Sequence, residues 1–229
     1  MELVAELDPP RDPKKLLEIV SGLARIYDWI DIPDAPLGKP NYNSPVISAY
    51  LTAHGYKVIA HLRTSDVNTI ALKTITKTLG ALGVRRIVYL KGDPPQQGSS
   101  VGDFTPEQAV YYARTRPEAP EPGLLLSLRK PITVIRERLR VPAGFYLVLN
   151  YDWEKHSTLS LLSQLKSEAP GKRFYVYAII REECTRSTEE VVEGAKRLQW
   201  IAEGLVISSP ARPACLYSIG ERIREELVG

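Results

Sequence analysis

Short apolar runs alternate along the chain with longer segments in which apolar residues recur every three or four positions. The short runs are rich in Val, Ile, Leu and Tyr and do not alternate strictly with polar residues, which is typical of strands covered on both faces. They predict eight strands, at Leu3–Leu7, Tyr27–Ile32, Lys57–Leu62, Arg86–Leu90, Leu124–Leu128, Phe145–Leu149, Phe174–Ile179 and Leu205–Ser208.

A segment with helical periodicity follows each predicted strand. Start signals such as Asp12–Pro13 and Thr105–Pro106 support several of these helices, because Asp and Thr cap the first turn and Pro is tolerated there. The predicted helices are Pro13–Arg25, Ser44–His54, Asp66–Leu82, Pro106–Arg114, Ile132–Leu139, Thr158–Glu168, Thr188–Glu203 and Cys215–Glu226.

Strict alternation of strands and helices predicts a closed (β/α)8 TIM barrel, with a doubly wound open sheet as the alternative. No Ser/Gly-rich linker and no shift in composition divides the chain, so we expect residues 1–229 to form a single TIM-barrel domain. Two connections, residues 33–45 and 92–106, are long and rich in proline. Loops of this length in a compact domain are usually functional or mobile.

Composition excludes several classes of protein. The formal net charge is only +3 and no basic block stands out, so we expect no nucleic-acid partner. The sequence has no long apolar span and no secretory signal, so we expect a cytoplasmic protein without membrane contact. Cys184 and Cys215 lack metal-type spacing, and we expect free thiols and no metal site. One Met and eighteen Pro suggest a thermophilic source.

Polar residues collect where the predicted strands end. Active sites of barrel enzymes lie at the carboxyl ends of the strands, so these positions are candidates for a site. The sequence has no GxGxxG, Walker, HExxH or GxSxG motif, which leaves a Rossmann dinucleotide site and a serine hydrolase without support. The candidates drawn from the strand ends include Glu6, Asp31, His61, Arg63, Lys91, Asp93, Arg129 and Asn150.

Two of these candidates are carboxylates in distinctive contexts. Glu6 follows the apolar run "LVA", so we expect it to point into the barrel mouth, where desolvation would raise its pKa and suit a general acid. The alternative is a salt bridge to a neighbouring arginine. Asp93 lies between Gly92 and two prolines, which pre-set its backbone and let a ligand come close. The alternative for Asp93 is an ordinary turn.

Three further candidates also have alternative interpretations. Lys91 could neutralise a phosphate or form a Schiff base, or it could belong to an ion pair at the rim. His61 could hydrogen-bond a ligand or be a satisfied core group. Asn150 offers the donor and the acceptor that a heteroaromatic ring edge needs, or it could cap the backbone.

Two segments resemble the methylenetetrahydrofolate reductase family. "AELDPPR" is similar to the family's opening, and "IAHLRTSDVNTIALKTITKTLGALGVRRIVYLKGDPP" is similar to its third and fourth strands with the helix between them. "VPAGFYLVLNYDWE" resembles a later segment more weakly. The ends of the second and fifth strands, "IDIPDAPLG" and "LLLSLRKP", depart from the family's flavin-contacting turns. FMN in place of FAD, or no flavin at all, therefore stays open.

The resemblance implies a TIM barrel that holds FAD and passes a hydride from NADH or NADPH to a methylene-folate or a modified pterin, in the one-carbon chemistry that supplies methionine biosynthesis. It implies that Glu6 protonates the folate N10 and that Asp93 lies near the flavin N1 and the pterin. The site residues that we expect are Glu6 and Asp93 as catalytic groups, His61, Arg63, Lys91, Gly92, Asp93 and Arg129 at the cofactor, and Asn150 and Asp31 at the substrate.

Two other functions stay open from the sequence. One is a barrel that has lost its cofactor and acts as a subunit of a larger one-carbon complex, in which the chain would be a homo-oligomer or have a partner subunit. The other is a barrel lyase that uses Lys91 as a Schiff-base nucleophile, which requires a desolvated amine.

Overall fold

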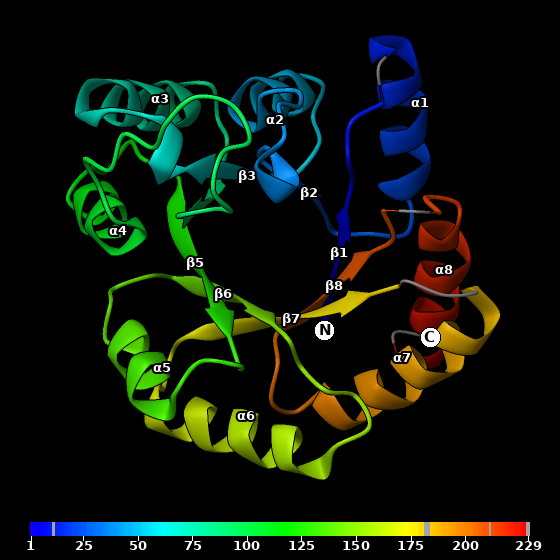
Figure 1. Cartoon of the computed structure of the whole chain (residues 1–229). Coiled ribbons are helices and arrows are strands. Elements are labelled where there is room, and N and C mark those ends of the chain that lie inside the picture. The colour runs from blue at the N-terminus through cyan, green and yellow to red at the C-terminus, as the bar shows by residue number, and fades with distance from the viewer. Residues whose placement is uncertain (11, 181–183, 211, 228–229) are drawn as a thin grey trace. The chain divides into compact units, whose positions relative to one another are not determined.

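A computed structural model describes residues 1–10, 12–180, 184–210 and 212–227, without the side chains of residue 13 and of residues 184–187. In this part of the chain, parallel strands close into a barrel in the order β1-β2-β3-β4-β5-β6-β7-β8 (Figure 1). This confirms the (β/α)8 barrel and excludes the open sheet. The strands are β1 Glu2–Glu6, β2 Trp29–Ile32, β3 Val58–Arg63, β4 Arg86–Leu90, β5 Glu121–Ser127, β6 Phe145–Leu149, β7 Arg173–Ile179 and β8 Gly204–Ser208.

A helix follows each strand, as the periodicity predicts. Most bounds agree with the prediction to within a few residues. The helices are α1 Pro13–Leu23, α2 Ser44–Ala53, α3 Thr69–Ala81, α4 Pro106–Arg114, α5 Ile132–Leu139, α6 His156–Glu168, α7 Cys184–Leu198 and α8 Cys215–Leu227.

Two helices differ from the prediction. Helix α3 begins at Thr69 rather than Asp66, because the Asn68 side chain accepts from the backbone N–H of Ala71 and caps the helix there. The preceding residues Thr64–Asp66 form a short 3-10 helix, η2. Helix α7 begins before the predicted Thr188 and ends at Leu198, after which the backbone N–H groups of Ile201 and Ala202 both donate to the Leu198 carbonyl in a turn.

The chain forms two compact units. Unit 1 comprises Met1–Ile30, Leu126–Arg140 and Phe145–Gly229, and unit 2 comprises Asp31–Leu125 and Val141–Gly144. The expectation of a single domain over residues 1–229 stays a prediction.

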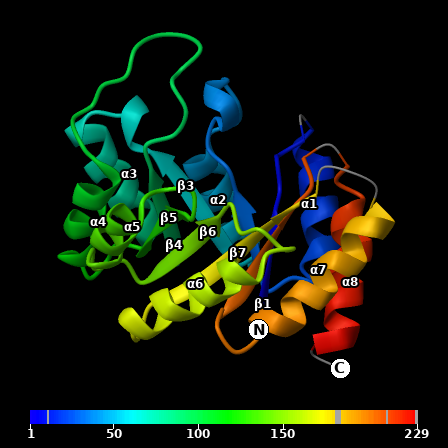
Figure 2. The ribbon, with the colours of Figure 1, turned by 60° about the horizontal axis from the view of Figure 1, so that its bottom comes forward.

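In unit 2, the register of β3 and β4 determines which side chains face the barrel interior. Leu62 lies opposite Tyr89, and the Tyr89 hydroxyl lies 2.8 Å from the Thr76 hydroxyl of α3, so this face of the two strands meets the helices. Alternate residues of a strand point to opposite faces. His61 and Arg63 therefore point inward. Helix α2 packs against β3 and α4 against β4 (Figure 2).

In unit 1, β8 pairs with β7 on one side and with β1 on the other. Helices α7 and α8 pack side by side, as Figures 1 and 2 both show. The buried hydroxyl of Tyr27 donates to the Leu216 carbonyl of α8 at 2.6 Å, and burial raises the pKa of this phenol. This bond joins the end of the α1–β2 connection to the last helix.

The expectation of free thiols is wrong for Cys215. This residue is fully buried at the start of α8 and its sulfur is part of a disulfide, so the described part of the chain holds no free cysteine. The sequence holds one other cysteine, Cys184, whose side chain lies outside the described residues. Separately, no helix in the described ranges is long and apolar enough to cross a membrane.

Candidate active site

Asp31 of β2 and His61 of β3 form a buried polar pair in unit 2. The His61 Nε2 lies 2.7 Å from Asp31 Oδ1, and the two residues are 4% and 0% exposed. Ser44, at the start of α2, supports the pair from behind: its hydroxyl donates to the Ile32 carbonyl at 2.6 Å and accepts from the His61 backbone N–H at 2.9 Å. The structure thus brings together two residues that the sequence assigned to substrate and cofactor.

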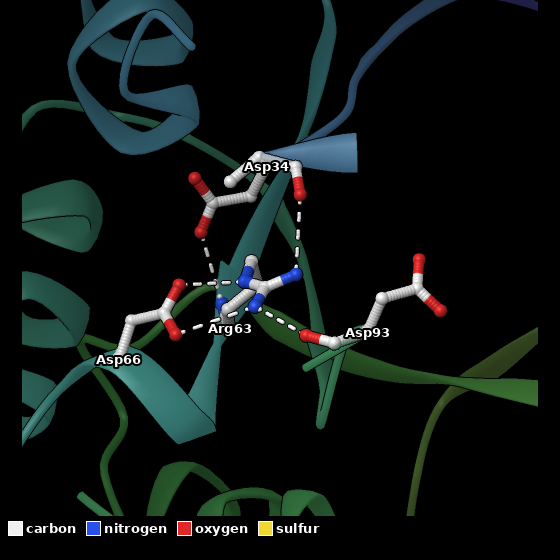
Figure 3. A network of polar contacts seen from close by, with 5 residues as sticks. Asp34, Arg63, Asp66 and Asp93 are labelled. Atoms are coloured by element: carbon white, nitrogen blue, oxygen red, sulfur yellow. Dashed lines mark hydrogen bonds and ion pairs between the residues drawn. The ribbon is translucent and has the colours of Figure 1, made fainter. Parts of the chain in front are cut away.

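The guanidinium of Arg63 joins three βα loops of unit 2 (Figure 3). Its Nε donates to Asp66 Oδ2 at 2.6 Å and its Nη2 to Asp66 Oδ1 at 3.3 Å. Nη1 donates to the Ala35 carbonyl at 3.1 Å, and Nη2 also donates to the Asp93 carbonyl at 2.7 Å. Arg63 is 1% exposed, so in this arrangement its donors serve protein acceptors rather than solvent.

Gly92 is required at its position for two reasons. Its φ of +78° lies in the left-handed region, which favours glycine, and a Cβ there would lie 2.4 Å from Arg63 Nη1. The space left by the missing side chain therefore receives the guanidinium. The carboxylate of the next residue, Asp93, is exposed and extends away from Arg63 in Figure 3.

The two proline-rich loops of unit 2 interlock. A Cβ on Gly38 would lie 2.1 Å from the Pro94 carbonyl oxygen, and the Gly38 carbonyl accepts from the Gln96 backbone N–H at 2.9 Å. The first loop holds two non-glycine residues at positive φ, Ala35 at 41° and Leu37 at 57°. Such conformations cost of order 1–3 kcal/mol each and persist only where the surroundings hold them in place.

Asp34 is a half-buried carboxylate beside this network. Its Oδ2 accepts from the Arg63 backbone N–H at 3.0 Å. Burial raises the pKa of the Asp34 carboxyl above its usual value, although hydrogen bonds from backbone N–H groups and the nearby His61 oppose the shift. An acid of this kind takes up a proton more readily than an exposed aspartate.

In unit 1, Glu6 ends β1 and is half-buried. The hydroxyl of Tyr177, a buried residue of β7, donates to Glu6 Oε1 at 3.3 Å. A phenol that donates to a carboxyl oxygen holds that side chain in one orientation. This contact lies at the end of β1, where the sequence predicts a general acid.

Asn150 and Arg129 lie near each other in unit 1, at the ends of β6 and β5. The Asn150 side-chain amide donates to the Ser127 hydroxyl at 2.9 Å, and the Arg129 backbone N–H donates to the same oxygen at 3.4 Å. Asn150 has a φ of 60°, which Asn tolerates better than most residues. The Arg129 side chain is exposed, as is that of Lys91 in unit 2.

Several residues of these networks lie outside the predicted set, among them Asp66, Ser44 and Tyr177. Asp66 could have been found from its spacing, because an acid three residues after Arg63 is well placed to pair with it. Ser44 and Tyr177 contact residues distant in the sequence, and no local signal indicates either contact. Within the described residues, no group of three His, Cys, Asp or Glu side chains is arranged to hold a metal ion.

The first half of the chain matches one family model. Residues 2–114 match the methylenetetrahydrofolate reductase family. The match confirms the resemblance over the part of the chain that holds Glu6, Asp31, His61, Arg63, Lys91, Gly92 and Asp93. The comparison with curated proteins found no match.

Solved structures share the fold of this chain at low identity. A mutant tryptophan synthase α-subunit from Pyrococcus furiosus has a TM-score of 0.65 and 16% identity, and the alignment covers 100% of this chain and 98% of that one. KGPDC from Streptococcus mutans has a TM-score of 0.62 and 12% identity, with 98% of each chain covered. At these identities the similarity shows the barrel fold alone.

Proposed function

We propose that this chain is a flavin-dependent reductase that converts a methylene-tetrahydrofolate, or a related pterin, to its methyl form. The observation that carries the proposal is the family match over residues 2–114, which includes both proposed catalytic groups, Glu6 and Asp93. A cytoplasmic location and NADH or NADPH as the electron donor belong to the same proposal.

The exposed side chains fit the chemistry of a flavin. The ring system has a polar edge, and the rest of the cofactor carries phosphate. The Asp93 carboxylate can accept from ring N–H groups, and the exposed cations of Lys91 and Arg129 can pair with phosphate. The guanidinium of Arg63 donates to acceptors within the protein, so we assign Arg63 a supporting role rather than a direct contact with the flavin. A bound flavin would supply the hydride for the reduction.

Glu6 is the proposed proton donor to the carrier. Opening the five-membered ring of a methylene-folate needs a proton at the ring nitrogen, and a half-buried carboxyl oriented by the Tyr177 hydroxyl is suited to supply it. Asp31 and His61, paired with each other in the interior, are proposed to shape the floor beneath the ligand. Asn150 offers an amide to the edge of a pterin, with Ser127 fixing its orientation.

The environment of Lys91 does not favour the lyase. A Schiff-base lysine needs a desolvated amine that is neutral near pH 7, and Lys91 is exposed just beyond β4.

The visible spectrum of the purified protein tests the proposal. We expect a yellow protein, or a colourless one that takes up added FAD with quenching of flavin fluorescence. Asp93→Asn should weaken that uptake, whereas Asp103→Asn, in the same loop but bonded to Thr69 at the start of α3, should not. A protein that binds neither FAD nor FMN would refute the flavin assignment, and co-purification with another subunit would then support the cofactor-poor alternative.

A further inference from the structure

One buried side chain, that of Arg63, contacts all three βα loops of unit 2. Arg63 donates to Ala35 in the β2–α2 loop, to Asp66 in the β3–α3 connection and to the main chain of Asp93 in the β4–α4 loop. Direct backbone bonds reinforce the contact: Gln96 N–H to the Gly38 carbonyl at 2.9 Å and Val101 N–H to the Ser65 carbonyl at 2.8 Å. Figure 2 shows the β4–α4 loop extending well beyond its strand.

We infer that Arg63 is a positioning residue, which holds these three loops together as one rim and thereby fixes the main chain from which Asp93 presents its carboxylate to a ligand. Arg63 bonds the carbonyl of Asp93 and leaves its carboxylate directed elsewhere (Figure 3). The identity of the ligand rests on the proposed function, whereas the role of Arg63 in joining the loops does not.

Arginine suits this position better than lysine. A lysine ammonium is a single point donor, whereas the planar guanidinium reaches a carboxylate on one edge and two carbonyls on the other sides. With Arg63 1% exposed, its removal would leave the Ala35 and Asp93 carbonyls without this donor and a guanidinium-sized space beneath Gly92. We therefore expect the β4–α4 loop to detach while the strands stay paired.

Two different substitutions should produce the same effect. Arg63→Ala removes the guanidinium. Gly92→Ala keeps it and places a methyl group 2.4 Å from the position of Nη1, so the guanidinium has to move. Gly98→Ala is the matched control: it lies in the same loop with the same φ of +78°, but a Cβ there meets nothing within 4 Å. The difference between Gly92→Ala and Gly98→Ala isolates the clash with Arg63.

Hydrogen exchange of two amides measures loop attachment without any ligand. The N–H groups of Gln96 and Val101 should exchange about tenfold faster in Arg63→Ala and Gly92→Ala than in the Gly98→Ala control, and the amides of β3 and β4 should keep their protection. Added guanidinium at a non-denaturing concentration should restore slow exchange in Arg63→Ala, because it fills the vacated space, and should have no effect in Gly92→Ala.

The affinity for FAD and the melting temperature separate positioning from general stability. We expect FAD affinity to fall about tenfold in Arg63→Ala and to recover when guanidinium is added. The melting temperature of the variant should stay unchanged over the same addition. Unchanged exchange at Gln96 and Val101 in both variants would overturn the inference. If Arg63→Ala does not fold, Gly92→Ala against Gly98→Ala decides alone. If the wild type binds no flavin and the exchange result still holds, the proposed function fails and the role of Arg63 stands.

Discussion

The imidazole of His61 lies 2.7 Å from the carboxylate of Asp31, and both side chains are buried where β2 and β3 end. A buried pair of this kind does not by itself show that the pair stabilises the fold. Removing one partner nevertheless lowers the free energy of unfolding, because the other polar side chain stays buried without that contact. His61 lies two residues before Arg63 on β3, so the two side chains point to the same face of the strand.

The first prediction concerns this pair. Asp31→Asn should lower the free energy of unfolding by about 3 kcal/mol, because the imidazole loses its charged partner inside the protein. Urea unfolding measures the change. In a double-mutant cycle with His61→Gln, the two losses should overlap by at least about 1 kcal/mol. Fully additive losses would show that the two side chains are not energetically coupled.

The second prediction concerns Asp34 and pH. Because burial raises the pKa of this carboxyl in the folded state, the folded protein binds a proton there more readily than the unfolded chain. The resulting stabilisation is fully present below the unfolded pKa, near 4, and is lost as the pH rises through the folded value. The melting temperature, followed upward from pH 4, should therefore fall more steeply in the wild type than in Asp34→Asn. Parallel profiles would contradict the raised pKa.

The third prediction concerns the proposed acid. Glu6→Gln should lower kcat by roughly 10²–10⁴-fold and leave FAD affinity unchanged, because it removes the proton but not the shape of the site. Tyr177→Phe removes the hydroxyl that orients Glu6 and should cause a smaller loss, about tenfold. Tyr111→Phe, a change on the exposed face of α4, is the control. Full turnover in Glu6→Gln would rule out Glu6 as the donor.

The fourth prediction concerns Cys215. Thiol titration of the denatured, unreduced protein should find no free thiol, and titration after reduction should find both cysteines of the sequence. Cys215→Ser should lower the free energy of unfolding by about 3 kcal/mol, the usual size of a disulfide contribution. A reactive thiol in the unreduced protein would contradict the disulfide and support the free thiols expected from the sequence.

The barrel could be predicted from the sequence because each element carries its own local signal. The apolar run of Arg86–Leu90 and the capped start at Thr105–Pro106 need no distant partner to be recognised. The start of α3 was misplaced because Asp66 and Asn68 are both good capping residues; in the structure Asn68 caps the helix, and the Asp66 carboxylate accepts from Arg63 instead.

The site could be predicted only in part. The positions of Asp31, His61 and Asp93 could be predicted from where the strands end. Which residues each of them contacts could not be predicted. Nothing local indicates that the guanidinium of Arg63 occupies the space beside Gly92, or that Tyr177 reaches Glu6 across 171 positions of sequence. Contacts of this kind depend on the register between strands, which a single sequence does not encode locally. The disulfide at Cys215 was missed because spacing alone does not identify a bond between distant elements.

The close approach of Gly38 to the Pro94 carbonyl restricts how this protein can be engineered. A βα loop on a barrel is ordinarily a replaceable module, since it can be exchanged without touching its neighbours. Here the β2–α2 and β4–α4 loops pack closely against each other. Replacing one of them with a loop from another barrel would remove the surface against which the second loop packs. Any attempt to change the ligand preference of this scaffold by loop exchange should therefore transplant both segments together.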